Sequence, residues 1–136
     1  LRERLALFEI GPVFHASEDG PLPDELPRLV LALAGPRETH HWEGADTTPV
    51  DFYDIKGIVT GLLHGLGLRE LRFEPAQHPS FHPGKSAKVM VGGRQLGVFG
   101  ELHPQVQAQY DLPIHSMQIA TFNQLVINEL EPDRFD

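Results

Sequence analysis

The sequence contains no cysteine, so it can form neither a disulfide framework nor a thiolate metal site. It also has no apolar run long enough to span a bilayer. The charged start, Leu1-Arg2-Glu3-Arg4, carries no signal-peptide pattern. These absences favour a cytoplasmic protein without a membrane partner. Since the chain starts without methionine and enters directly into apolar residues, we expect it to be a segment of a longer protein.

Positive charge is also scarce. The chain has 11 lysines and arginines against 19 acidic residues, which gives a formal net charge of −8 with neutral histidines. The basic residues are scattered and form no run. Because phosphate backbones attract basic surfaces, this balance argues against a free-standing nucleic-acid-binding protein.

The size and apolar content fit one globular unit. The chain has 136 residues, of which 40% are hydrophobic. That is enough for one core and too little length for two. We therefore expect a single domain over residues 1–136.

Two short apolar runs near the start predict β-strands. Residues 5–10 are expected to form a buried strand that stops at Gly11-Pro12, where proline removes a hydrogen-bond donor. Residues 15–27 contain Gly20 and three prolines, which is the composition of a loop. Residues 29–34, closed by Gly35-Pro36, predict a second strand.

The clearest helical signal covers residues 51–66. Its apolar residues recur at spacings of three and four, as on one face of a helix. Asp51 is the expected N-cap or first-turn acid, and Gly67 is the expected stop after the last turn.

The second half of the chain is richer in strands. Residues 71–74 predict a short strand, and residues 78–84 predict a rigid loop fixed by two prolines. In that loop Gly84 is expected to take a backbone conformation that a Cβ would oppose. Residues 87–91 and 95–100, joined through Gly92-Gly93, predict a hairpin.

The C-terminal part predicts one more helix and one more strand. A short helix is expected to start at His103-Pro104 and run through Tyr110, because proline is tolerated in a first turn. Residues 117–126 alternate in places and predict the last strand. Strands outnumber helices and one hairpin is necessarily antiparallel, so we expect an α+β fold with a mostly antiparallel sheet flanked by helices.

Several local patterns resemble known phosphate-binding or metal-binding motifs but lack residues that those motifs require. Gly84-Lys85-Ser86 resembles the end of a phosphate-binding P-loop, but Pro79 stands where that loop needs glycine and a strand follows. The closest histidine groupings, His40-His41 and His78 with His82, lack the further ligands of a zinc site. We expect these histidines to be structural and expect no metal ligand in this chain.

Acidic residues give an equally weak catalytic signal. Asp51 and Asp54 fall in a first helical turn, where the helix dipole favours acids. Glu101 ends an apolar strand beside His103 and has the chemistry for general acid–base work. A cap or hydrogen-bond partner for the following helix is the favoured interpretation. The pattern does not decide whether Trp42 and Tyr53 belong to the core or to an interface.

Four segments taken together resemble a known family. In order and spacing they are similar to the catalytic-like domain in the C-terminal half of the bacterial phenylalanyl-tRNA synthetase beta subunit. The resemblance runs from about Leu7 to about Tyr110. The segments are Leu7-Phe-Glu-Ile-Gly-Pro-Val-Phe14, Asp51-Phe-Tyr-Asp-Ile-Lys-Gly57, Phe81-His-Pro-Gly-Lys-Ser-Ala87 and Gly97-Val-Phe-Gly-Glu-Leu-His-Pro104.

The resemblance implies a fold and a setting. It implies a domain similar to a class II aminoacyl-tRNA synthetase core, in an enzyme of two alpha and two beta chains. The implied partners are the alpha subunit, other beta-chain domains and, for the holoenzyme, tRNA(Phe). ATP and magnesium are implied for the holoenzyme, and no cofactor for this segment. The family often has an acidic residue in the last strand, whereas Gln118-Ile-Ala-Thr-Phe-Asn123 has none.

Catalysis by this segment is not expected. Class II synthetases resemble one another in holding ATP phosphates with arginines on the strands of the core. Neither residues 8–11 nor residues 97–102 contain arginine, although phosphate needs such donors. The expected function is therefore a non-catalytic structural or subunit-interface module of phenylalanine–tRNA ligase. The alternatives are an active ATP-dependent ligase core and a stand-alone RNA-binding domain.

No residue is therefore assigned to catalysis, cofactor binding or metal binding. Without its neighbours the segment is expected to self-associate or to expose an apolar patch. Nine residues remain candidates for structural or interface roles: Phe81, His82, Pro83, Gly84, Ser86, Gly97, Gly100, Glu101 and His103.

Overall fold

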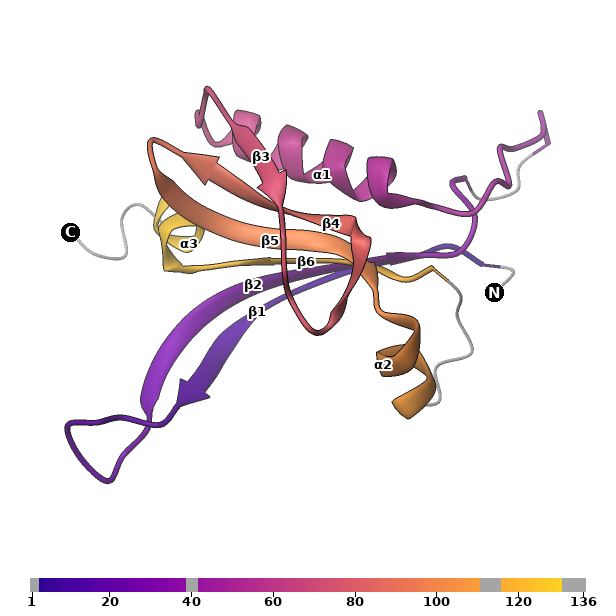
Figure 1. Cartoon of the computed structure of the whole chain (residues 1–136). Helices are drawn as coiled ribbons and strands as arrows, with labels where there is room; N and C mark the ends of the chain where they lie inside the picture. The colour runs from indigo at the N-terminus through magenta and orange to yellow at the C-terminus, as the bar shows by residue number, and fades with distance from the viewer. Residues whose placement is uncertain (1–2, 39–41, 111–115, 131–136) are drawn as a thin grey trace.

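The chain is built around one antiparallel sheet (Figure 1). The computed structural model describes residues 3–38, 42–110 and 116–130. Within them lies a six-stranded sheet with the order β1-β2-β6-β5-β4-β3, and all its strand pairs are antiparallel. The elements in chain order are β1 (Leu5–His15), β2 (Asp24–Ala34), α1 (Phe52–Gly65), β3 (Arg72–Pro75), β4 (Phe81–Val91), β5 (Arg94–Leu102), α2 (Pro104–Gln109), β6 (Gln118–Phe122) and α3 (Gln124–Leu130). The expected α+β class, with a mostly antiparallel sheet and helices, is confirmed.

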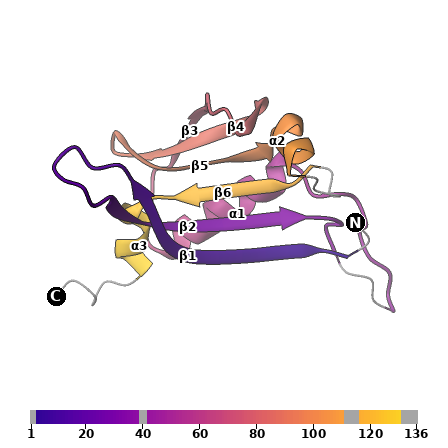
Figure 2. The ribbon, with the colours of Figure 1, turned by 90° about the horizontal axis from the view of Figure 1, so that it is seen from below.

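The core lies between the sheet and two helices on one of its faces. Buried residues of α1 (Ile55, Val59, Leu63) and of α3 (Val126, Ile127) belong to one apolar cluster with residues of the four central strands. In Figure 2, which looks at the molecule from below, the strands lie in front of α1, so the opposite face of the sheet is open to the viewer. No helix among the described residues is long and apolar enough to cross a membrane.

Helix α1 begins and ends as its sequence predicts. Asp51 is the N-cap and accepts hydrogen bonds from the backbone N–H groups of Tyr53 and Asp54. The Asp54 carboxylate accepts in return from the Asp51 backbone N–H, which completes a capping box. After the last turn, Gly67 has φ 85°, a conformation that glycine adopts without a Cβ penalty.

The first two strands are longer and more exposed than expected. β1 continues through Gly11-Pro12 to His15, and β2 starts at Asp24 inside the expected loop. The prolines are tolerated because Pro12 lies on an edge strand and its partner Pro27 lies beyond the stretch paired with β6. The expected burial of β1 is wrong, since Leu7 and Phe8 are 60% and 73% exposed. An edge position explains this, because a strand at the edge has fewer neighbours.

In the middle of the chain, one further prediction is wrong. Residues 81–84, expected to lie in a loop, form the start of β4. The hairpin between β4 and β5 is confirmed, and Gly92 and Gly93 at its tip both have positive φ. Helix α2 is also confirmed, with His103 as its N-cap and Tyr110 as its C-cap.

The predicted last strand is correct only in its first part. β6 ends at Phe122, and the chain then turns into α3 instead of continuing extended to residue 126. Asn123 marks the change, because its side-chain oxygen accepts a hydrogen bond from the Leu125 backbone N–H. β6 pairs with β2 on one side and β5 on the other, which fixes its register and makes it a central strand.

Candidate functional site

Most of the candidate residues come together where β4 begins and β5 ends. Phe81 pairs with Leu102, and Ser86 pairs with Gly100. Between these pairs β4 carries residues 82–85, whereas β5 carries only Glu101. The extra residues form a bulge, and a bulge re-aims side chains at the rim of a sheet. We call the residues 81–86 and 100–103 the β4–β5 bulge.

Two glycines permit close contact between strands. At Gly100 a Cβ would collide with the backbone of Lys85 and Ser86, and at Gly97 it would collide with Thr121 and Phe122. Both positions therefore need glycine because of the space available. Gly84 differs, since a Cβ there would meet only the His82 ring at 3.7 Å, an ordinary contact. Its φ is not positive, so the expected backbone constraint at Gly84 is wrong.

A polar cluster joins Lys85 and Glu101 of the bulge to Gln118 of β6. Lys85 Nζ is 3.5 Å from Glu101 Oε2, and Gln118 Nε2 donates to Glu101 Oε1 at 3.4 Å. Glu101 is 8% exposed and Gln118 is fully buried. Gln118 Nε2 also donates to the Ser116 carbonyl at 3.1 Å, while its Oε1 has no hydrogen-bond partner among the described residues. Glu101 therefore pairs within the sheet, and the expectation that it caps α2 is wrong, because His103 is the N-cap.

The histidines that precede proline share one local geometry. The Nδ1 atoms of His78, His82 and His103 accept hydrogen bonds of 3.0–3.1 Å from the backbone N–H two residues later. Such a bond imitates the turns that Asn and Asp side chains make. At His103 it also caps α2. The structural interpretation of His78 and His82 is thus supported, while His40 and His41 lie outside the described residues.

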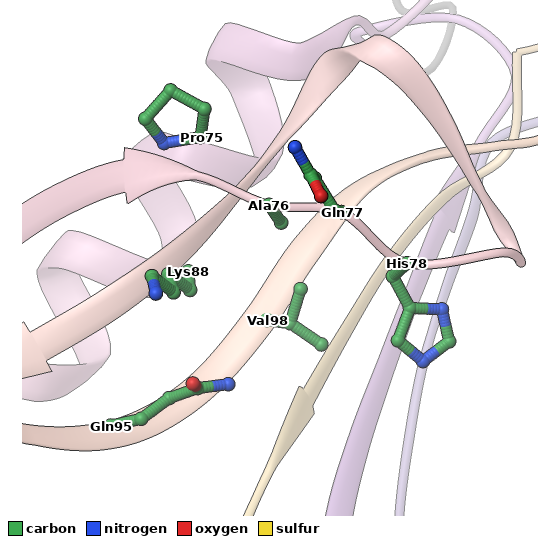
Figure 3. Close-up of a pocket in the computed structure, with 7 residues that line it drawn as sticks. All are labelled: Pro75, Ala76, Gln77, His78, Lys88, Gln95 and Val98. Atoms are coloured by element: carbon green, nitrogen blue, oxygen red, sulfur yellow. The ribbon is translucent and has the colours of Figure 1, made fainter.

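The open face of the sheet holds two adjoining hollows that share His78, Gln95 and Val98. One has a volume of about 420 Å³ and is also lined by Lys88 and residues 75–77 (Figure 3). The other, of about 360 Å³, is also lined by Arg28, Val13, Val30, Gly97, Thr121 and Asn123. Lys88 pairs with Glu74 at 3.4 Å, so Arg28 is the free cation of this lining within the described residues.

These hollows do not fit a magnesium-bound triphosphate. Magnesium is held in proteins by oxygen ligands, above all by carboxylates, and none of the residues that line either hollow is acidic. Among the described residues there is also no group of three or more His, Asp or Glu that suits a metal ion. A single arginine offers far fewer donors than a phosphate chain requires.

The family follows from the sequence match. Residues 2–121 match the family model of the phenylalanyl tRNA synthetase beta chain CLM domain. The chain belongs to this family. A phenylalanine–tRNA ligase beta subunit of Symbiobacterium thermophilum is 45% identical over 109 residues, which cover 80% of this chain and 12% of the relative. A beta subunit of Burkholderia lata is 46% identical over 118 residues, covering 82% of this chain and 14% of the relative.

The fold of this CLM domain is shared with a solved synthetase. Pyrrolysyl-tRNA synthetase from Desulfitobacterium hafniense superposes with a TM-score of 0.62 at 16% identity, covering 94% of this chain and 41% of that one. At this identity the likeness concerns the fold alone. The chain spans only about an eighth to a seventh of the length of the beta subunits that it matches.

Several features of this CLM domain have no local signal in its sequence. Nothing in the sequence marks Gln118 as buried, because its neighbours in β5 and β2 come from distant segments. The ion pair of Arg37 with Asp54 joins residues 17 positions apart and has no local signal. Trp42 and Tyr53, left open between core and interface, are 92% and 74% exposed, which excludes the core.

Proposed function

We propose that this chain is a non-catalytic module of the phenylalanine–tRNA ligase beta chain, with a core similar to that of class II synthetases. It would constitute a single domain over residues 1–136 and help to form an interface in an enzyme of two alpha and two beta chains. The observation that carries the proposal is the family match combined with hollows that lack acidic residues and offer one free cation. The holoenzyme would use ATP and magnesium elsewhere, act on tRNA(Phe) and work in the cytoplasm.

The surface of the domain supports an interface role. Large apolar side chains on one face of the first strand are exposed: Phe8, Ile10 and Phe14. Exposed apolar patches of this kind mark protein contacts. They also agree with the expectation that the domain, taken alone, exposes an apolar patch. The partners would be the alpha subunit and other domains of the beta chain.

The β4–β5 bulge would serve this role as a scaffold. Gly100 lets β4 and β5 lie close together, the side chains of His82 and His103 each accept a backbone hydrogen bond, and Lys85 pairs with Glu101. The candidates Phe81, His82, Pro83, Ser86 and His103 would therefore shape the domain without touching substrate. No step of aminoacylation is assigned to them.

Two measurements test the proposal. The isolated domain should neither bind ATP in a calorimetric titration nor catalyse phenylalanine-dependent pyrophosphate exchange. It should co-elute with the matching alpha subunit, alone or as part of the full beta chain. Exchange activity that disappears on replacing Glu101 or Lys85 would instead favour an active ligase core, and failure of the full beta chain to co-elute with alpha would refute the interface role.

A further inference from the structure

The end of the first hairpin extends beyond the rest of the domain. β6 pairs with β2 only from Leu29 to Leu33, so residues 10–27 have no third strand beside them. Figure 1 shows these residues as a curved two-stranded ribbon that projects at the lower left, away from α1. We call residues 10–27 the arm. None of its residues is buried.

The arm carries large apolar side chains on both of its faces. Val13 pairs with Leu26 on one face, and Phe14 points to the other because successive strand residues alternate. Phe14 is 62% exposed, and Leu22 at the tip is 79% exposed. A two-stranded ribbon is marginally stable by itself in water. Apolar residues on both faces of such a ribbon therefore indicate that another surface covers it.

The charge of the arm restricts what that surface can be. The arm contains four acidic residues, Glu18, Asp19, Asp24 and Glu25, and no lysine or arginine, within a chain of net charge −8. The ion pairs found in the described part of the chain involve none of these four carboxylates. Two such arms repel each other, and the arm also repels RNA phosphates. A basic protein surface is the complementary partner.

We propose that the arm docks into an apolar recess of another polypeptide region that is rimmed by lysine or arginine, with Phe14 and Leu22 as its anchors. Large apolar side chains at the centre of a contact supply most of its affinity, whereas charges at the rim steer association and set the register. This inference rests on the proposed function, because the recess would lie in the assembled ligase, outside residues 1–136. It adds a defined segment and a defined partner chemistry to the interface role.

Photo-crosslinking in the assembled ligase tests the docking. A photoreactive phenylalanine analogue replaces Leu22 in the full beta chain, which is then assembled with the alpha chain and irradiated. The expected product joins the arm to a segment outside residues 1–136 that has lysine or arginine within a few residues of the link. The same analogue at Tyr110, which is 68% exposed but lies off the arm, serves as a control and should give a different product or none.

Charge reversal supplies an independent readout. Asp24→Lys combined with Glu25→Lys should lower the crosslink yield at Leu22 several-fold, and added salt should reduce the yield of the unmodified chain. Glu43→Lys combined with Glu129→Lys makes the same change of charge at exposed positions off the arm and should leave the yield unchanged. Leu22→Ser, in a chain that carries the analogue at Phe14, should weaken the link without reversing any charge.

Three outcomes would overturn the docking proposal. The first is a set of crosslinks confined to the arm itself or to a second arm. The second is a crosslink to tRNA. The third is a crosslink yield that does not change on charge reversal. Co-purification of alpha with the beta chain is measured in the same samples. If alpha and beta still co-purify while the arm gives no external crosslink, the docking inference fails and the interface module stands; loss of co-purification in the unmodified chain would refute the module itself.

Discussion

Arg37 holds Asp54 through two parallel hydrogen bonds, in which Nε donates to Oδ1 and Nη2 donates to Oδ2, each at 3.0 Å. Arg37 follows β2 in the chain, and Asp54 lies in the first turn of α1, so the pair ties the connection between the two elements to the start of the helix. Arg37 Nη1 also donates to Asp46 at 3.2 Å. A bidentate geometry of this kind gives more specificity than a simple contact between charges.

The Arg37 pair predicts a pH-dependent loss of stability. Partial burial of the Asp54 carboxyl acts to raise its pKa, but hydrogen bonds from Arg37 and from the Asp51 backbone N–H outweigh this, so the pKa lies below the ordinary value. The stabilisation is therefore fully present above the ordinary Asp pKa of about 4, and it is lost as pH falls through the lower folded pKa. Arg37→Ala should lower the urea midpoint at pH 7, and the difference from the unmodified domain should shrink in acid.

A matched control separates this pair from general charge effects. Arg72 Nη2 lies 3.1 Å from Glu74, and the Arg72 side chain is 65% exposed. Pairs exposed to this degree contribute little to stability. Arg72→Ala should therefore leave the urea midpoint nearly unchanged at both pH values. Equal effects of the two substitutions would contradict a specific role for Arg37.

Three glycines predict a graded series of stabilities. Gly97→Ala and Gly100→Ala place a methyl group against the backbone of a neighbouring strand, and overpacking of this kind costs about 1–3 kcal/mol. Gly84→Ala meets only the edge of the His82 ring and should stay within about 0.5 kcal/mol of the unmodified domain. Chemical denaturation of the three variants measures the series. A Gly84→Ala variant as unstable as the other two would restore the constraint that the sequence pattern predicts there.

Local signals predicted the parts of the fold that local chemistry decides. Asp51 and Gly67 mark the ends of α1, and Gly92-Gly93 mark a hairpin tip, because caps and tight turns depend on a few adjacent residues. Residues 5–10 form a strand as predicted, but the same apolar run suits a buried or an edge strand. Strand order decides between them, and strand order is a property of the whole chain.

The candidate site shows the same division. The turn at His78 follows from proline placement and was predicted, whereas His82 makes the same kind of side-chain hydrogen bond within β4, where a loop was expected. The contacts of Glu101 were not predicted, because its partners lie on the two strands that flank β5. Lys85 is on β4, across the bulge, and Gln118 is on β6. The break at Asn123 was missed because the apolar residues of a short helix are also compatible with a continuing strand.

The polar cluster predicts an acid-dependent variant. Gln118→Glu would place a second carboxylate at a fully buried position next to Glu101, where two neighbouring negative charges are disfavoured. The variant should lose about 3 kcal/mol or more near neutral pH, as expected for an uncompensated buried charge. Acidification should restore part of that loss, because one carboxyl then takes up a proton. Gln118→Met, which is uncharged, should show a loss that does not depend on pH.

The exposed face of β1 predicts how the isolated domain behaves in solution. Without the partners proposed for it, Phe8 stays in water at 73% exposure, next to an apolar groove lined by Ala6, Leu31, Ile55 and Ile58. Burial of such surface favours self-association, whereas the net charge of −8 opposes it. Salt screens the repulsion more than it affects the apolar contact. The domain should therefore sediment as a monomer at low salt and associate as salt is raised.

A substitution on that face identifies the surface responsible. Phe8→Glu should keep the domain monomeric at both salt concentrations and reduce the binding of a hydrophobic dye. Tyr110→Glu changes an aromatic residue of similar exposure at the C-cap of α2. This variant should leave the association intact. A monomer at every salt concentration that also binds no dye would mean that the partner surface is polar and transient. Association that survives Phe8→Glu would place the contact elsewhere, with the arm as the next segment to test.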